Sequence, residues 1–253
     1  MLREVAEYPN SFAPLGPATE RLETPRYTLC LGAGSTWNTV QRQRFALEEL
    51  DEVLEEVRAA LRERDRTQTQ WEVGTSAPPG LVDALLGRGL RLDKDPYAVA
   101  VALVLTHEPP AMRPGFTARR VETLEELEAA CEVQWEAFRA SPEEVAEARS
   151  LLTTLFREST TLRHAVWLDG RIVSNGTASP TTHGLLLYGG ATLPDARGRG
   201  AYRALIRARW DDAAALGTPT LITQGGSMSR PILERLGFDR IGEVHMLLDE
   251  FTG

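Results

Sequence analysis

Residues 189–205 read GGATLPDARGRGAYRAL and join an apolar strand pattern to the start of an amphipathic helix. The loop between these two elements contains Arg197-Gly198-Arg199-Gly200. Its glycines let the backbone bend until several N–H groups point into one concavity, where the positive end of the helix dipole favours an anion. The two arginines add positive charge. The segment predicts a diphosphate site, with an ordinary strand-to-helix turn carrying solvated arginines as the alternative interpretation.

The elements around this loop form a longer series. Three prolines and a glycine within residues 108–115 cannot continue a helix or a central strand, so they predict a domain boundary near residue 110. Apolar periodicity, capping residues and turn residues then predict an alternating series of helices and strands. The series is a strand at 116–121, two helices ending near 159, strands at 162–168, 171–178 and 185–192, a helix at 201–216, a strand at 220–223, a helix at 229–236 and a strand at 244–248.

This loop and this element order together resemble the GNAT superfamily of N-acetyltransferases. The acyl-CoA-binding motif of that family is Arg/Gln-x-x-Gly-x-Gly/Ala, and Arg197 and Gly200 stand at its first two fixed positions. Tyr202 replaces the last small residue of the motif. The segment Leu236-Gly237-Phe238 also agrees with the family pattern. The resemblance covers the C-terminal part of the chain, from residue 116 to residue 251.

The resemblance implies an α+β (mixed α/β) fold, the GNAT acyl-CoA N-acyltransferase fold, with a mostly antiparallel, splayed central sheet flanked by helices. It implies acetyl-CoA as the acyl donor and direct attack by a primary amine of a small molecule or peptide, with positioning and carbonyl polarisation providing most of the rate. The resemblance assigns cofactor binding to Ala191, Thr192, Arg197, Gly198, Arg199, Gly200, Ala201 and Tyr202.

The groups that transfer protons in the family are replaced in this sequence. Leu233 stands where many members have a tyrosine that protonates the departing thiolate, and Leu186 stands where some have a glutamate base. Tyr188, on the same strand face as Leu186, and Ser229, ahead of the short helix, are the candidate catalytic substitutes. The simpler interpretations are a packed strand aromatic for Tyr188 and a helix cap for Ser229.

Two other functions stay open at this point. Leu186 and Leu233 also suit a CoA-binding sensor or pseudoenzyme without turnover. Some tandem members of the family transfer from an aminoacyl-tRNA, but the acidic net charge and the intact loop argue against that reaction.

The first 109 residues echo the latter half of the C-terminal pattern. They predict a hairpin within 27–41, a long helix at 47–61, a strand at 70–73, a helix at 79–88 and a strand at 97–105. The segment at the place of the loop, VQRQRF at 40–45, contains no glycine, so its side chains would obstruct a phosphate. We therefore expect a degenerate GNAT-like domain at 1–109 without a phosphate loop, a complete GNAT domain at 110–253, and one cofactor site per chain.

Composition limits the partners of this chain. Its 253 residues include 28 lysines and arginines and 36 aspartates and glutamates, a formal net charge of −8 that argues against nucleic acid or an anionic membrane as the main partner. Two cysteines cannot form a disulfide framework, and no Cys/His cluster suggests a metal. The charged N-terminus and the absence of a long apolar run predict a cytoplasmic protein. The oligomeric state stays open, with a homodimer among the states allowed.

Overall fold

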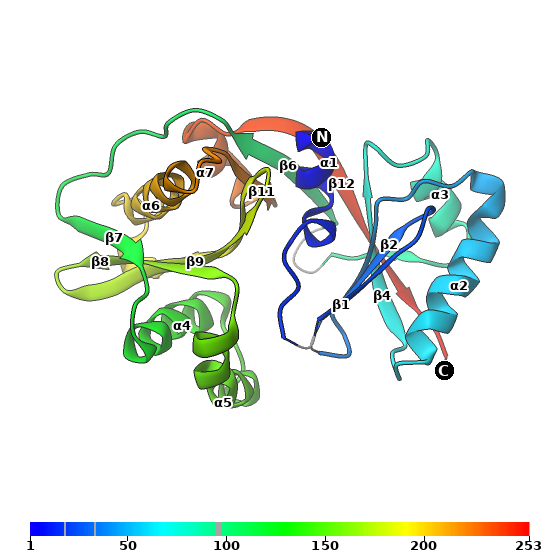
Figure 1. The fold of residues 1–253 in the computed structure, drawn as a ribbon, viewed down its shortest axis with the longest axis horizontal. Coiled ribbons are helices and arrows are strands. Elements are labelled where there is room, and N and C mark those ends of the chain that lie inside the picture. The colour runs from blue at the N-terminus through cyan, green and yellow to red at the C-terminus, as the bar shows by residue number, and fades with distance from the viewer. Residues whose placement is uncertain (18, 33, 95–97, 253) are drawn as a thin grey trace. The chain divides into compact units, whose positions relative to one another are not determined.

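The computed structural model describes residues 1–17, 19–32, 34–94 and 98–252. Contacts within the chain divide it into two compact units (Figure 1). The first unit comprises Met1–Val104, Gln224–Arg235 and Asp239–Gly253, and the second comprises Leu105–Thr223 and Leu236–Phe238.

The first unit is built on a mixed sheet in the strand order β1-β2-β3-β4-β12-β6, with the short β5 also paired to β12. The strands β3 and β4 are parallel and pair only at Thr39↔Gln70 and Val40↔Trp71, whereas β12 is antiparallel to both β4 and β6. The elements are α1 (Leu2–Glu7), a 3-10 turn (Pro9–Ser11), β1 (Glu20–Glu23), β2 (Thr28–Leu31), β3 (Asn38–Gln41), a 3-10 turn (Leu47–Glu49), α2 (Leu50–Arg62), β4 (Gln68–Gly74), α3 (Leu81–Leu86), β5 (Arg91–Leu92), β6 (Val99–Leu105), α7 (Arg230–Arg235) and β12 (Asp239–Glu250).

The last strand of the chain belongs to this first unit by its packing. Residues Val244–Glu250 of β12 pair with β4, and Leu247 lies in the same core as Trp71 and the apolar face of α2. The division into 1–109 and 110–253 stays a prediction, and the contacts add that the C-terminal strand completes the N-terminal sheet. The strand predicted at 97–105 is described from Val99, and residue 97 lies outside the described residues.

The second unit has a five-strand sheet in the order β11-β10-β9-β8-β7. Only β10 and β11 are parallel, and they pair at Leu185↔Leu221 and Leu186↔Ile222; the other neighbours are antiparallel. The elements are β7 (Phe116–Arg120), α4 (Leu124–Phe138), α5 (Pro142–Glu158), β8 (Leu162–Leu168), β9 (Arg171–Thr181), β10 (Gly184–Thr192), a 3-10 turn (Pro194–Ala196), α6 (Ala201–Ala215) and β11 (Leu221–Gly225).

The two faces of this second sheet are covered by different helices (Figure 1). Successive strand residues point to opposite faces. Val166 shares a core cluster with Ala204 of α6, whereas its neighbour Ala165 shares one with Ala130 of α4. The sheet therefore has an α6 face and an α4 face.

Two helix starts of the second unit are closed by side-chain caps. The Ser141 side chain accepts from the Glu144 backbone N–H at 3.2 Å, and the Glu144 carboxylate accepts from the Ser141 N–H at 2.7 Å. At α4, Thr123 accepts from the Glu126 N–H at 3.1 Å, but the Glu126 carboxylate accepts from the N–H of Glu122 instead of the cap residue. Each cap satisfies N–H groups that have no partner within the helix.

A carboxylate is buried where β3 and β4 separate in the first unit. The fully enclosed Glu72 accepts hydrogen bonds from Gln41 at 2.8 Å and from Asn10 and Gln224 at 3.4 Å. Ser11 donates its backbone N–H and its hydroxyl to Gln41, both at 2.8 Å. The N-terminal segment thus closes the end of this strand pair, and burial raises the pKa of Glu72 to about 7.

Glu72→Gln should change the pH dependence of stability. Because the folded-state pKa is raised above the ordinary 4.5, the folded protein retains a proton that the unfolded chain has released, and stability falls as pH rises from about 5 to 8. The variant removes this loss and should gain about 2 kcal/mol relative to the native protein over that interval. Thermal and urea unfolding at pH 5 and pH 8 measure it, with the exposed Glu48→Gln as control. Parallel pH curves for the Glu72 variant and the native protein would contradict the assignment.

Candidate functional site

The loop between β10 and α6 depends on two glycines with positive φ. Gly198 has φ +74° and Gly200, the residue before α6, has φ +116°, a region that L side chains rarely adopt. A Cβ on Gly200 would also lie 3.0 Å from Cδ of Arg113. The first turn of α6 contains no acidic residue. The start of this 15-residue helix can therefore accept a negatively charged group.

Arginines surround this loop without carboxylate partners. Arg197 Nε donates to the Thr192 carbonyl at 3.1 Å, and Arg113 Nη1 donates to the Arg199 carbonyl at 3.3 Å. Among the described residues, no ion pair involves Arg113, Arg197, Arg199 or Arg203. Their charges are held near the loop and are not neutralised by the protein.

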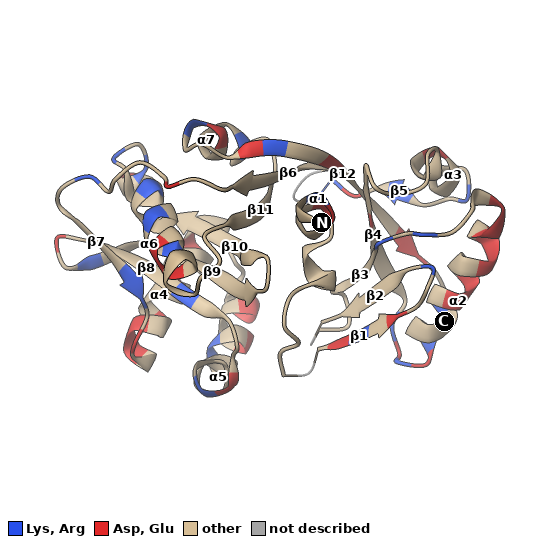
Figure 2. Ribbon diagram, turned by 45° about the horizontal axis from the view of Figure 1, so that its top comes forward, with Lys and Arg blue, Asp and Glu red and all other residues tan. Residues whose placement is uncertain are grey.

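In the first unit, the connection between β3 and α2 corresponds to this loop, but its arginines are paired with a carboxylate. Arg42, at 3.0 Å, and Arg44 both pair with the carboxylate of Glu4. The first turn of α2 contains Asp51 and Glu52, and the next turn contains Glu55 and Glu56 (Figure 2). Acidic groups at a helix N-terminus disfavour a bound anion.

A β-bulge in β10 bends the strand just before the loop. The register with β9 shifts between Tyr188 and Ala191, and Gly189 has φ +55°. A Cβ on Gly190 would approach the Tyr202 ring to 2.9 Å. Bulges re-aim side chains and end strand pairing. The backbone register of β10 with β11 is given at Leu185↔Leu221 and Leu186↔Ile222, and one residue further the Thr223 hydroxyl donates to the Leu187 carbonyl at 3.2 Å.

The guanidinium of Arg209 supports this bulge from the α6 face. Arg209 is 1% exposed, and its Nη2 donates to the carbonyls of Thr177 at 3.1 Å and Tyr188 at 3.2 Å. A Cβ on Gly176 would lie 1.8 Å from this nitrogen. Burial lowers the pKa of Arg209 to about 10. Sequence reasoning missed Arg209; the available signal was an arginine among the alanines and leucines of the buried helix face, with a glycine inside the facing strand.

The residues expected to bind the cofactor gather at one end of the second unit. Ala191 and Thr192 end β10, and the Ser174 hydroxyl lies 2.6 Å from the Ala191 carbonyl and 2.8 Å from Thr192 Oγ1. Ala201 is the first residue of α6 and is buried in the core, and Tyr202 packs against Gly190. The loop residues 197–200 connect these two positions.

The two candidate catalytic residues belong to different compact units. Tyr188 lies on β10 of the second unit, and its hydroxyl oxygen is enclosed. Ser229 precedes α7 in the first unit, where its carbonyl accepts from the N–H groups of Ile232 and Leu233 at 3.0 Å. Leu233 and Leu186 are buried apolar residues. Neither leucine can transfer a proton.

A histidine on the α6 face is part of an ion-paired cluster. His164 is fully buried, and its Nε2 lies 2.6 Å from Asp212 Oδ2, which also accepts from Arg120 Nε at 2.5 Å. Burial lowers the pKa of His164. This enclosed imidazole stabilises the packing of α6 on the sheet and has no open side for a substrate.

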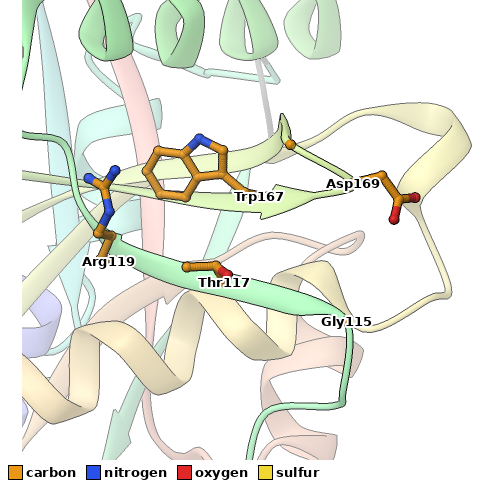
Figure 3. Close-up of a pocket in the computed structure, with 6 residues that line it drawn as sticks. Gly115, Thr117, Arg119, Trp167 and Asp169 are labelled. Atoms are coloured by element: carbon orange, nitrogen blue, oxygen red, sulfur yellow. The ribbon is translucent and has the colours of Figure 1, made fainter.

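An open hollow lies at the β7 edge of the second unit (Figure 3). The Arg119 guanidinium stands 4.3 Å from the ring centroid of Trp167, and its hydrogen bonds lower the pKa of Glu126 to about 2. The arginine is thus paired on both sides. The hollow contains none of the predicted site residues and is lined by Gly115, Thr117, Arg119, Trp167, Asp169 and Gly170.

Within the described ranges, no three His, Cys, Asp or Glu side chains are grouped as ligands of a metal ion. No helix in the described part of the chain has the length and apolar character needed to cross a bilayer.

Comparison with known proteins identifies the fold. No family model matches the chain, and no curated protein matches it by sequence. A GCN5-related N-acetyltransferase from Kribbella flavida superposes with a TM-score of 0.69 at 19% identity, covering 91% of this chain and 89% of that chain. A tandem GNAT protein from the clavulanic acid biosynthesis pathway has a TM-score of 0.63 at 18% identity, covering 100% and 88%. A GCN5-related N-acetyltransferase from Sphaerobacter thermophilus has a TM-score of 0.65 at 16% identity, covering 92% and 83%.

These likenesses define the class of fold. The chain has the GNAT fold, of the α+β class, and the likeness extends over both compact units. The fold expected from the loop and the element order is therefore confirmed.

Proposed function

We propose that this protein is an acyl-CoA-dependent N-acetyltransferase that transfers the acetyl group of acetyl-CoA to a primary amine of a small molecule or peptide. The observation that carries the proposal is the loop at residues 197–200, with its two left-handed glycines, the start of α6 and arginines that have no carboxylate partner. The resemblance of residues 189–205 to the family's acyl-CoA motif assigns a diphosphate to this loop, and the GNAT fold supports that assignment.

The residues of the second unit fit such a donor. The amides from Gly198 to Tyr202 suit the diphosphate, and Arg197 and Arg199 provide charge. The Leu187 carbonyl accepts from the Thr223 hydroxyl at 3.2 Å, so we assign the pantetheine arm to the backbone of β10 beyond this residue, near Ala191 and Thr192. In the first unit the equivalent arginines are already neutralised by Glu4, which supports one cofactor site per chain.

Acetyl-CoA supplies an activated acyl group, and the chain positions it and moves protons. An incoming ammonium loses one proton, and the neutral amine attacks the thioester carbonyl. As the C–S bond breaks, the nitrogen gives up a second proton, and the departing thiolate takes up a proton to leave as CoA thiol. We assign the relay of the first proton to water to Tyr188, whose hydroxyl is enclosed in this structure and has to be uncovered when the acceptor binds. Arg209 holds the Tyr188 carbonyl, and with it the bend of β10.

A CoA-binding sensor is the second candidate, because buried leucines occupy both standard proton-transfer positions. Thioester consumption with a panel of amines separates the two functions. Release of CoA thiol in the presence of one of the amines supports the transferase. Tight binding of acetyl-CoA without turnover for any amine supports the sensor.

Replacing Gly198 and Gly200 together with valine should abolish acetyl-CoA binding, because both positions need left-handed backbone and close approach of the ligand. Calorimetric titration measures the affinity. Gly217→Val is the matched control, since Gly217 has φ +78° at the other end of α6 and introduces similar strain away from the loop. Unchanged affinity in the double variant would remove the loop from the site.

Charge removal should distinguish the two units. Arg197→Gln with Arg199→Gln should weaken acetyl-CoA binding by about tenfold or more and reduce its dependence on salt, because charge-assisted bonds to phosphate are lost. Arg42→Gln with Arg44→Gln removes the same charge from the first unit and should leave affinity unchanged. Equal losses in the two double variants would contradict a single site. The measurement is calorimetry at two salt concentrations.

Tyr188→Phe should lower turnover at saturating acetyl-CoA by about a hundredfold, the usual scale of a lost proton-transfer group. The affinity for acetyl-CoA should stay close to that of the native protein, because the phenol is not assigned to the diphosphate. Initial rates across pH 6 to 9 check the assignment. Native turnover in the variant would eliminate Tyr188 as the proton-transfer group.

A further inference from the structure

Arg163 and Tyr188 lie in one row across the second sheet. Arg163 of β8 is directly opposite Thr177 of β9, and Thr177 is directly opposite Tyr188 of β10. Residues directly opposite each other in antiparallel strands project from the same face. At roughly 4.8 Å per strand, the two outer Cα atoms are about 10 Å apart. Because Ala165, two residues after Arg163, packs with α4, the whole row is on the α4 face.

The guanidinium of Arg163 is oriented by amides and not by a carboxylate. Its Nη1 donates to Gln134 Oε1 at 3.0 Å and to Asn175 Oδ1 at 3.1 Å. In the described part of the chain, no aspartate or glutamate forms an ion pair with it. Arg163 is only partly exposed, so its charge is held in a fixed direction beside the strands and remains uncompensated.

Asn175 presents an orphaned donor at the same place. The residue is 0% exposed, and its Nδ2 has no hydrogen-bond partner among the described residues. The side-chain amide of Asn175 cannot be flipped to exchange Oδ1 and Nδ2, because Oδ1 must accept the hydrogen bond from Arg163. A buried donor left unpaired is costly, so this arrangement indicates that an acceptor atom binds here.

We call the group formed by Arg163, Gln134 and Asn175 the cationic pocket. It adjoins the bulge of β10. The amide nitrogen of Gln134 lies 3.4 Å from the position of a Cβ on Gly189. The pocket is therefore beside the strand to which the proposed function assigns the pantetheine arm. The phosphate loop begins α6, which covers the opposite face.

We propose that the acceptor is an amine that also carries a carboxylate, an amino acid or short peptide, and that Arg163 and the Asn175 amide bind this carboxylate. The inference deepens the proposed transferase and rests on it. A carboxylate offers two coplanar oxygens, which can accept from the guanidinium and from Nδ2 together. The separation of about two strands between Arg163 and Tyr188 suits an amine and a carboxylate only a few bonds apart.

Acetylation of the twenty amino acids and of their matching carboxamides tests the substrate class. The native protein should prefer at least one free acid over its amide by about tenfold or more in kcat/KM, because only the acid can take both donors. Arg163→Gln should raise KM for that acid and remove the preference. Equal rates for acid and amide with the native protein, or a preference retained in the variant, would overturn the proposal.

Two further variants separate this role from a structural one. Asn175→Asp supplies a carboxylate within the protein, so it should raise the unfolding temperature and abolish the preference for acids. Arg157→Gln removes the same charge from an exposed position of α5 and should leave the preference intact. An Asn175→Asp protein that still prefers acids would contradict the binding role of the pocket.

Binding measurements distinguish failure of the carboxylate-binding proposal from failure of the transferase proposal. The same amino acids and amides are titrated calorimetrically into the native protein saturated with CoA and into Arg163→Gln. Acid-selective binding that disappears in the variant, without turnover of any amine, supports the carboxylate pocket while refuting the transferase. Turnover of amines with no selectivity for acids, in rate or in binding, supports the transferase while overturning the pocket.

Discussion

The site in the second unit depends on the buried guanidinium of Arg209. With no aspartate or glutamate paired to it among the described residues, it donates to the carbonyls of Thr177 and Tyr188. It therefore requires a glycine at 176 and a displaced segment in β10. The bulge interrupts the pairing of β10 with β9 between Tyr188 and Ala191, and the pairing resumes at Ala191↔Asn175, next to the loop. At this bulge Gly189 lies beside Gln134, which also accepts a hydrogen bond from Arg163.

Charge is distributed unevenly in a chain whose formal net charge is −8. Around the loop of the second unit, the described residues give the arginines no carboxylate partner, whereas in the first unit Glu4 neutralises Arg42 and Arg44. The end of the β3 and β4 pair is also closed there, by Ser11 and Asn10 against Gln41 and Glu72. A local positive potential can persist on an acidic protein because nearby charges dominate over distant, screened ones.

Local interactions account for the features that could be predicted from residue patterns. The start of α5 follows from Ser141 and Glu144, which are three residues apart and satisfy each other's N–H groups. The loop before α6 could be predicted because its backbone has positive φ at residues 198 and 200, and both are glycines, which adopt that conformation without strain. Such signals involve neighbours in the chain, so no knowledge of packing is needed. The prediction did not reach α1, β1 or β5, which are short and lack a clear period.

The sequence by itself determined the element order, the helix starts and the glycine-arginine loop. Only the tertiary structure decided that β12 completes the first sheet, that Arg209 lies under the bulge, and that Arg163 meets Asn175 and Gln134. The reason is physical: these arrangements depend on strand partner and register between segments far apart in the chain. A shift of one residue in register would reverse which face each side chain occupies.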